Sequence, residues 1–371
     1  MTKYGGLKTG PLPLKTGDLD PLSLVTRLFR SHFLRDRFNI LNRFSPFCVS
    51  AEADPIPTAF DEPVAFSDLM DERAKQLLAD NETIVVSWSG GVDSTAVIVA
   101  LLRNLPREDY RRIKVIGTEQ SINEGPNFYK TMLDLGINVN VTNELLDDLG
   151  EEDCDAVVSG WCADQLFGSD IHLRNLDLYN RPWIDALDWH VRNQFMNRLS
   201  NRSKSILFDV YTDYAKRLGV NVEQWCEFAW MFNFGVKYTF VKEHARLVLG
   251  GSPNQDKICP FFDTLDFQRY SVSRFPMLRE TNMYANQQDY KVPLKQYIYV
   301  FSGDKDYLEK KGKVNSWASQ FSRYCYTSKS LPILTDEGLK LFTNAEVGEE
   351  CDSCQSEMSA KVGEMFRKEG R

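Results

Sequence analysis

The sequence lacks long apolar stretches and any excess of positive charge. No segment approaches the roughly 20 consecutive apolar residues that span a bilayer. The N-terminus also lacks the apolar core that follows the charges of a signal peptide. The net charge of −8 weighs against a surface dedicated to nucleic acid. We therefore expect a cytoplasmic protein with no membrane partner, and nucleic acid is not an expected partner.

Cysteine and histidine are too scattered to predict a zinc site or a disulfide framework. The eight cysteines are spread along 371 residues, and only Cys351 and Cys354 are separated by two residues. The four histidines have no spacing that would complete a four-ligand zinc site. We interpret the cysteines as free thiols, and the Cys351 and Cys354 pair as part of a solvated tail rather than a metal or redox site.

The most informative pattern is a segment rich in glycine and serine between two apolar runs. Residues 84–88 form a short β-branched run typical of a buried strand, and 95–104 are typical of a helix. Glycines between a strand and a helix let the backbone approach an anion, and the first helical N–H groups favour negative charge. The pattern predicts a phosphate cradle formed by Ser89, Gly90, Gly91, Asp93 and Ser94.

Asp93 is the unexpected member of this loop. A carboxylate beside phosphates is repelled unless a cation lies between them, and Mg²⁺ is the usual cation there. We therefore predict that Asp93 is a magnesium ligand. The loop has neither the spacing of a Walker A motif nor that of a dinucleotide fingerprint.

The pattern around this loop predicts an α/β fold. Strands alternating with helices favour a doubly wound, mostly parallel sheet with ligands at the carboxyl ends of its strands. After residue 170 we expect a mainly helical half without further strands. The expected strands are 84–88, 113–118, 137–141 and 156–160; the expected helices are 68–78, 95–104, 123–135, 183–199, 203–218, 222–234, 236–249 and 264–271, with 264–345 mainly helical.

Four segments follow from this pattern. Residues 1–65 form an N-terminal extension, 66–170 an α/β core, 171–345 a helical part and 346–371 a charged tail. The extension carries several arginines among aromatics between 24 and 44; this stretch packs on the main domain as a helix or hairpin, or contacts a partner or nucleic acid. The aromatics of 225–234 are interpreted as core.

A second acidic loop follows the fourth expected strand. Asp164 comes after Ser159 and Gly160, and parallel strands end at the same edge of a sheet. Asp93 and Asp164 could therefore share a magnesium ion bound to phosphates. From spacing alone, an ordinary capped loop is an equal alternative.

The first loop resembles the Ser-Gly-Gly-x-Asp-Ser signature of the PP-loop (HUP-like) ATP pyrophosphatases. These enzymes cleave ATP between its α and β phosphates and adenylate a substrate oxygen. The second loop is similar to the Ser-Gly-x-x-Ala-Asp-Glu-Leu-Phe-Gly-Gly stretch of asparagine synthetases, through Ser159, Gly160, Ala163, Asp164, Leu166, Phe167 and Gly168. The resemblance implies that Ser159 and Gly160 contact the nucleotide, and that adenine lies near Gly117 and Thr118.

Downstream segments extend the resemblance to nearly two thirds of the chain, residues 83 to 316. Residues 259–263, Cys-Pro-Phe-Phe-Asp, look like the family's Pro-Phe-Leu-Asp, and 290–295 are similar to its Lys-x-x-Leu-Arg. Lys310-Lys311-Gly312 looks like its late Lys-Lys-Gly. The resemblance implies that Lys291, Lys310 and Lys311 are catalytic, because they would meet developing charge on the phosphoryl oxygens.

Three departures from the family pattern concern the nitrogen donor and the proton acceptor. The glutamine-hydrolysing members begin with a cysteine after Met1, where this chain has Thr2 and only about eighty residues before its first strand. Trp161 and Gln165 replace acids of the second loop, and neither side chain can accept a proton as a carboxylate does. We expect the nitrogen donor to be free ammonia, a bound amine or the product of a separate glutaminase.

The resulting hypothesis is an AMP-forming ligase that uses ATP and Mg²⁺ to join a small-molecule carboxylate to an amine or ammonia. One alternative is adenylation of a nucleobase before thiol or amine transfer, with Cys162 as the suspected thiol. Another is a non-catalytic protein that senses nucleotides, which the changes at Trp161 and Gln165 would allow.

Overall fold

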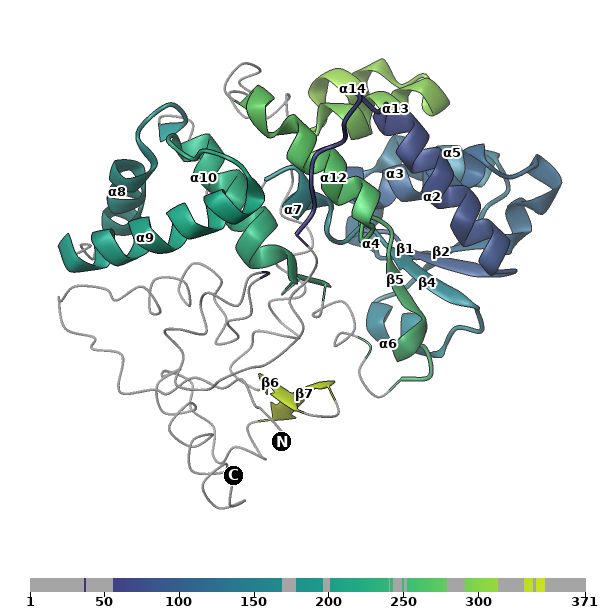
Figure 1. The fold of residues 1–371 in the computed structure, drawn as a ribbon. Helices are drawn as coiled ribbons and strands as arrows, with labels where there is room; N and C mark the ends of the chain where they lie inside the picture. Colours follow the sequence, from purple (N-terminus) through teal and green to yellow (C-terminus); the bar gives the residue numbers. More distant parts are fainter. Residues whose placement is uncertain are drawn as a thin grey trace. The chain divides into compact units, whose positions relative to one another are not determined.

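In the computed structural model, which Figure 1 shows as a ribbon, the chain forms two compact units. Unit 1 comprises 1–56, 170–243 and 321–371, and unit 2 comprises 57–169 and 244–320. The structure describes residues 37, 56–168, 178–195, 201–239, 241–242, 249, 252–278, 291–312, 330–335 and 338–343. The expectations for the rest of the N-terminal extension, for the charged tail and for the Cys351 and Cys354 pair lie outside these residues.

Unit 2 contains a five-stranded parallel sheet, as the alternation of strands and helices predicts. Its strands, in the order β3-β2-β1-β4-β5, are β1 (Ile84–Ser87), β2 (Ile113–Gly117), β3 (Asn138–Val141), β4 (Ala156–Ser159) and β5 (Ile258–Pro260). Every neighbouring pair is parallel. The chain runs outward from β1 through β2 to β3 and then returns to the other side of β1 for β4. The strand order therefore reverses between β1 and β4, which is where open α/β sheets bind ligands.

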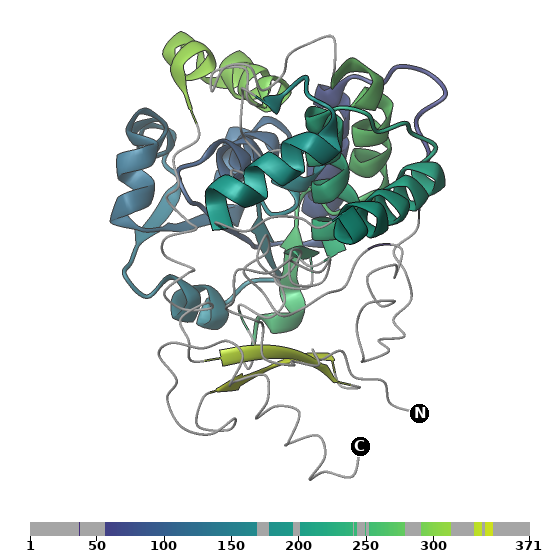
Figure 2. The same cartoon turned by 90° about the vertical axis from the view of Figure 1, so that its left-hand side faces the viewer.

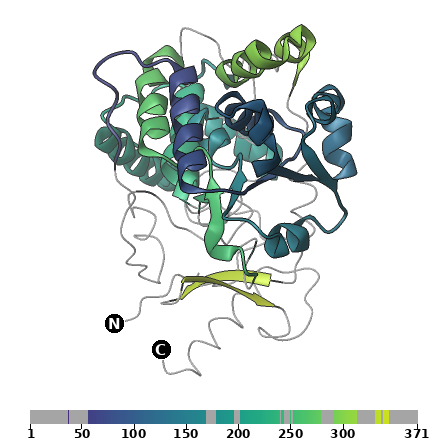
Figure 3. The same ribbon diagram turned by 90° about the vertical axis from the view of Figure 1, so that its right-hand side faces the viewer.

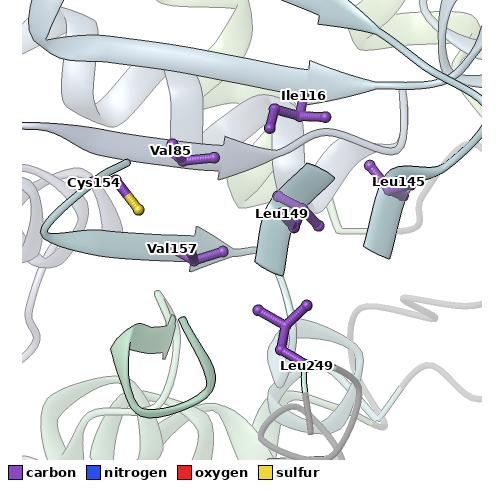
Figure 4. Packing of buried hydrophobic residues seen from close by; sticks show 7 residues of the cluster. All are labelled: Val85, Ile116, Leu145, Leu149, Cys154, Val157 and Leu249. Atoms are coloured by element: carbon purple, nitrogen blue, oxygen red, sulfur yellow. The ribbon is translucent and has the colours of Figure 1, made fainter. Parts of the chain in front are cut away.

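One face of the sheet packs on the short helix α6 (Leu145–Glu151). Val85, Ile116 and Val157 from three adjacent strands form a buried cluster with Leu145 and Leu149 of the helix (Figure 4). Cys154 and Leu249 complete the cluster. Because successive side chains of a strand point to opposite faces, the residues before and after each of these three point to the other face of the sheet.

Helices from distant parts of the sequence pack together in the rest of unit 2. α3 (Val92–Arg103) packs on β1, on β4 and on α2 (Phe66–Asp80). α13 (Val292–Ser302) packs on α3, and α12 (Leu265–Arg274) lies beside α2 (Figure 3). Ten of the twelve residues of α3 are buried, so its pattern is a continuous apolar run rather than a stripe. Besides α4 (Glu119–Glu124) and α5 (Pro126–Asp134), which are treated below, the other helices of unit 2 in the described residues are η2 (Arg107–Arg112), α7 (Ala163–Leu166), η6 (Gln255–Lys257), η7 (Phe275–Leu278) and α14 (Lys305–Lys310).

The described middle of unit 1 is helical and aromatic. It consists of α8 (Trp183–Phe195), α9 (Asn201–Leu218), α10 (Trp225–Met231) and the π-helix η5 (Phe232–Lys237). The rings of Trp183 and Phe228 stack with centroids 5.0 Å apart. Trp225, Trp230 and the phenylalanines of 228–234 are buried, which confirms the prediction that they are core residues.

The prediction that strands end at residue 170 is wrong. β5 pairs with β4, with Pro260 opposite Ser159. In unit 1, β6 (Ser330–Thr335) and β7 (Gly338–Thr343) pair antiparallel (Figure 2). β5 has only three residues and includes a proline, so it gives little strand signal. Residues 330–335 and 338–343 carry apolar residues that suit a helix or a strand, and the expectation of a helical half misassigned them.

The single helix expected at 123–135 is two helices. α4 (Glu119–Glu124) ends at Gly125, and α5 (Pro126–Asp134) begins directly after it. Proline has no N–H and fits the first turn of a helix, so Pro126 starts α5 and cannot continue α4. Glu124 therefore ends a helix rather than opening one.

None of the described helices has the length and apolarity needed to cross a bilayer.

A leucine pair tests the core of unit 2. Leu149 is buried in the α6 cluster, whereas Leu133 of α5 is half exposed. We expect Leu149→Ala to lower the free energy of unfolding by about 2–5 kcal/mol, because it removes buried apolar volume. Leu133→Ala should change it by less than about 0.5 kcal/mol. Chemical denaturation of both variants measures the difference, and equal losses would contradict the assigned core.

Candidate functional site

The candidate site lies where β1 and β4 end. These strands pair in register, with Ser87 opposite Ser159, so the loops that follow them begin side by side. The loop after β1 enters α3 and carries Asp93 on the first turn of that helix. The loop after β4 enters α7 and carries Asp164. The strand pairing thus brings together the two acidic loops that the sequence analysis singled out.

Hydrogen bonds within the loop 89–94 hold its two serines against each other. The hydroxyls of Ser89 and Ser94 are 3.1 Å apart, and the Ser89 N–H donates to the Ser94 hydroxyl. The Gly91 N–H donates to the Ser89 hydroxyl. The N-cap of α3 is Gly91, which has no side chain to cap the helix. The first N–H groups of α3 therefore lack the side-chain partner that normally satisfies them.

At two positions of the site, any residue larger than glycine would clash with neighbouring backbone atoms. Gly90 has φ +76°, and a Cβ there would lie 2.2 Å from the backbone oxygen of Ser121. A Cβ at Gly160 would lie 2.7 Å from the backbone nitrogen of Ser94. The end of β4 therefore touches the start of α3, and the two loops meet without intervening side chains.

Two residues adopt a left-handed backbone next to the acids. Cys162 (φ 73°) is the N-cap of α7, and Lys291 (φ 50°) is the N-cap of α13; they are the only non-glycine residues with positive φ in the described part of the chain. Such conformations cost on the order of 1–3 kcal/mol each and cluster at functional sites. Here they turn Asp164 and Lys291 toward the same place.

Lys291 bridges the two predicted magnesium ligands. Its ammonium group donates to both carboxylate oxygens of Asp93 and lies 2.8 Å from Oδ1 of Asp164. The Lys291 side chain is 1% exposed, against 24% for Asp93 and 33% for Asp164. One buried ammonium thus stands between two partly open carboxylates.

The structure separates the two adjacent lysines of the Lys-Lys-Gly segment. Lys310 is 70% exposed and pairs with Asp306 one turn earlier in α14, so it does not join the site. Lys311 is largely covered by its neighbours, donates to the backbone oxygen of Glu124, and has its Nζ 3.7 Å from Oε1 of that residue. Burial lowers the pKa of Lys311, and the Glu124 carboxylate opposes that effect.

Gly117 and Thr118, the predicted adenine contacts, lie at the end of β2, and both have structural roles there. A Cβ at Gly117 would lie 3.0 Å from the backbone oxygen of Trp88, so glycine allows the close approach of the loop after β1. The Thr118 hydroxyl caps α4 by accepting from the Ser121 N–H, and Thr118 is buried.

The remaining residues of the β4 loop differ in exposure. Ser159 is buried, and its hydroxyl has no hydrogen-bond partner among the described residues. Gln165 is buried in α7, and Trp161 is partly exposed. Cys162, the suspected thiol, is only 1% exposed. A thiol buried to this degree is poorly placed to act as a nucleophile.

Glu124 belongs to the site and was not predicted. Its Oε1 lies 3.4 Å from where a Cβ of Gly91 would be, so its side chain packs against the loop 89–94. Sequence reasoning took Glu124 for the start of a helix. The signal that could have found it is an acid directly before Gly-Pro, soon after the end of β2.

Among the residues that the structure describes, no group of three acids, histidines or cysteines could hold a metal ion alone. The site offers two carboxylates instead. Mg²⁺ bound to nucleotide phosphates commonly uses one or two protein carboxylates, so this donor set fits a metal that arrives with its ligand.

The chain matches no model of a known protein family, and a search among curated proteins likewise finds no match.

Alanine substitutions at two glycines with the same backbone conformation distinguish the cost of backbone strain from that of a steric clash. A Cβ at Gly90 (φ +76°) would meet the Ser121 backbone, whereas a Cβ at Gly136 (φ +75°) would have nothing within 4 Å. We expect Gly136→Ala to lower the free energy of unfolding by about 1–2 kcal/mol, because only backbone strain is added. Gly90→Ala should lower it by about 2–5 kcal/mol, because the clash adds to that strain. Urea denaturation of both variants measures this, and equal losses would argue against the tight packing of the loop.

Proposed function

We propose that this protein is an ATP-dependent, AMP-forming ligase of the PP-loop type, similar to the synthetase part of asparagine synthetases. It adenylates a substrate carboxylate and passes the acyl group to an amine or ammonia. The observation that carries the proposal is the meeting of Asp93, Asp164 and Lys291 at the reversal point of the sheet. The three side chains come from segments that resemble three separate motifs of that family.

The loop 89–94 supports the phosphate part of the proposal. Gly90 and Gly91 leave the backbone open to an anion, and the α3 N-terminus presents uncapped N–H groups with a favourable dipole. Ser89 and Ser94 already hold the loop in shape, so little reorganisation would accompany binding. The Ser159 hydroxyl, which has no partner in the described part of the chain, adds a donor from the β4 loop.

Asp93 and Asp164 would hold Mg²⁺ in this proposal. When bound, the ion would neutralise charge on the phosphates and on the departing pyrophosphate. The pair carries two negative charges, of which Lys291 offsets one. The net charge of the three groups therefore favours a further cation at this place.

The lysines would act on the reacting phosphoryl group. A carboxylate oxygen attacks the α-phosphorus, and the bond to the bridging oxygen of pyrophosphate breaks. Lys291 contacts Asp93 of the loop 89–94, and Lys311 contacts Glu124, which packs against the loop. From these positions the two lysines would stabilise the negative charge that develops. Lys310 has no part in this mechanism, because it is exposed and paired with Asp306.

In the second step the amine nitrogen attacks the acyl carbon, AMP leaves, and the nitrogen loses a proton. Trp161 and Gln165 do not accept protons, so the proton acceptor differs from the acid that the family has at these positions. We favour a bound amine or free ammonia as the donor, and a separate glutaminase is the third source. The burial of Cys162 disfavours the alternative of thiol transfer to a nucleobase.

A product assay separates a ligase from a nucleotide sensor. Purified protein with Mg²⁺, α-labelled ATP and a fractionated metabolite pool should form AMP and pyrophosphate with one fraction. Asp93→Asn should lose at least about 100-fold of that rate, because one charged group of the transition-state site is removed. Asp134→Asn, an exposed acid on α5, is the matched control and should keep it.

The other results of this assay have defined meanings. Formation of ADP in place of AMP would refute the AMP-forming ligase. Binding of ATP without turnover in any fraction would also refute it and would favour the sensor. Transfer of a label to a nucleobase would favour the alternative enzyme class.

The bridging position of Lys291 predicts competition between its ammonium and a divalent ion. Without nucleotide, Lys291→Gln should bind Mn²⁺ about tenfold more tightly than the wild type, because a charge that repels the ion is removed. Lys130→Gln, an exposed lysine on α5, should leave the affinity unchanged. Electron paramagnetic resonance of free Mn²⁺ measures both. Equal affinities in the wild type and Lys291→Gln would show that the lysine and the ion do not share the two carboxylates.

A further inference from the structure

Glu124 is a buried acid beside a loop that is built to bind an anion. Its side chain is 4% exposed, and it ends α4 directly before the break at Gly125. Its Cβ lies 2.9 Å from where a Cβ of Gly90 would be, so it occupies the space that the glycine leaves. The next residue, Gly125, also lies against the loop, because a Cβ there would be 3.1 Å from the backbone oxygen of Gly90.

A carboxylate in this position would repel phosphate if it were alone. At about 4 Å, two like charges near a protein surface repel by roughly 4 kcal/mol. Glu124 does not cap α4, because Thr118 and Ser121 form the capping box at the other end of that helix. The role of its charge therefore depends on the groups that it contacts.

Its partner is Lys311, which follows α14 far along the chain. The lysine is held twice, by the backbone oxygen and by the carboxylate of the same residue. Its side chain is 11% exposed. A buried ammonium is costly unless an opposite charge compensates it.

The other groups around Lys311 do not replace Glu124. The ring of Tyr307 lies 5.8 Å from the ammonium, and burial raises the pKa of this tyrosine, which keeps it neutral. Lys311 lines a cavity of about 220 Å³ at the surface. The charged side chains that share this cavity are Glu124, Asp304, Asp306 and Lys310, and Lys310 is paired with Asp306.

We propose that Glu124 is a positioning residue, which holds the Lys311 ammonium beside the loop 89–94 so that it is in place for the phosphates. The role of the pair in binding phosphates rests on the proposed function, whereas the effect of Glu124 on the position and pKa of Lys311 does not. Burial lowers the pKa of Lys311, and the nearby acid opposes this effect and so favours the charged form of the lysine. An ammonium has three N–H donors, so it can bind phosphate oxygens while it remains paired with the carboxylate.

The first test is independent of any enzymatic activity. Competitive labelling of ligand-free protein with trace acetic anhydride, read by mass spectrometry over a pH series, gives the titration midpoint of Lys311. Glu124→Gln keeps the size of the side chain and removes its charge. We expect it to lower the midpoint by at least about one pH unit, because an opposite charge at this distance favours the protonated lysine.

Two variants complete the test. Glu119→Gln, an exposed acid at the other end of α4, should leave the midpoint unchanged. Glu124→Asp keeps the charge but withdraws it by one methylene, so its midpoint should lie between those of the wild type and Glu124→Gln. If Glu124→Gln does not fold, the Asp variant carries the test. A Lys311 midpoint that neither substitution moves would overturn the proposal.

The second test links the pair to catalysis. The rate of AMP formation should fall at high pH as Lys311 loses its proton, and in Glu124→Gln this fall should begin at lower pH by the same shift. A purely structural role would instead lower the rate equally at every pH. If the wild type forms no AMP, the proposed function fails while the labelling result still decides the role of Glu124.

Discussion

The pairing of β1 with β4 is the constraint on which the candidate site depends. Their register aligns Ser87 with Ser159, so two acidic loops begin at one edge of the sheet. Gly160 lets those loops touch, because any side chain there would meet the backbone at the start of α3. Two carboxylates that are brought together in this way repel each other unless a cation separates them. The left-handed turn at Lys291 supplies an ammonium for that purpose. The left-handed conformation of Lys291 and the closeness of Asp93 and Asp164 are thus linked, because the ammonium compensates the repulsion between the two carboxylates.

Local patterns and a topological rule were enough to predict the core of this arrangement. The strand, glycine turn and helix around residue 90 are encoded within about 20 residues, and the rule that parallel strands end at one edge brings Asp164 near Asp93. The rest depends on contacts between distant segments. No local signal indicates that Lys291 reaches back to Asp93, or that Ile258–Pro260 extends the sheet. Glu124 could not be predicted as a site residue, because its position depends on the space left by a glycine in another loop. Thr118 was assigned to a ligand, yet its hydroxyl is used by a helix cap.

Lys310 and Lys311 illustrate why residue type alone does not define a site. They are neighbours in sequence and share one motif, but α14 ends between them. The first remains on the exposed face of the helix and pairs with an acid one turn away, in a contact worth little in water. The second follows the end of the helix and packs against Glu124 with its side chain only 11% exposed. Desolvation raises the free energy of the charged form of Lys311 but has little effect on the exposed Lys310. Only Lys311 therefore needs a compensating charge beside it.

The split of unit 2 into 57–169 and 244–320 has a consequence for synthesis on the ribosome. Well over a hundred residues separate Asp164 from Lys291. At the usual rates of translation, the first acid would precede its ammonium partner by roughly 6–25 s. For most of that interval β4 also lacks β5 on its outer edge, and α3 lacks α13 throughout it. The aromatic helices α8 to α10 are contiguous in sequence and emerge complete in the meantime. The site therefore cannot form until Lys291 has emerged, and a nascent chain that stalls before this residue presents two acidic loops without the ammonium group that pairs with them.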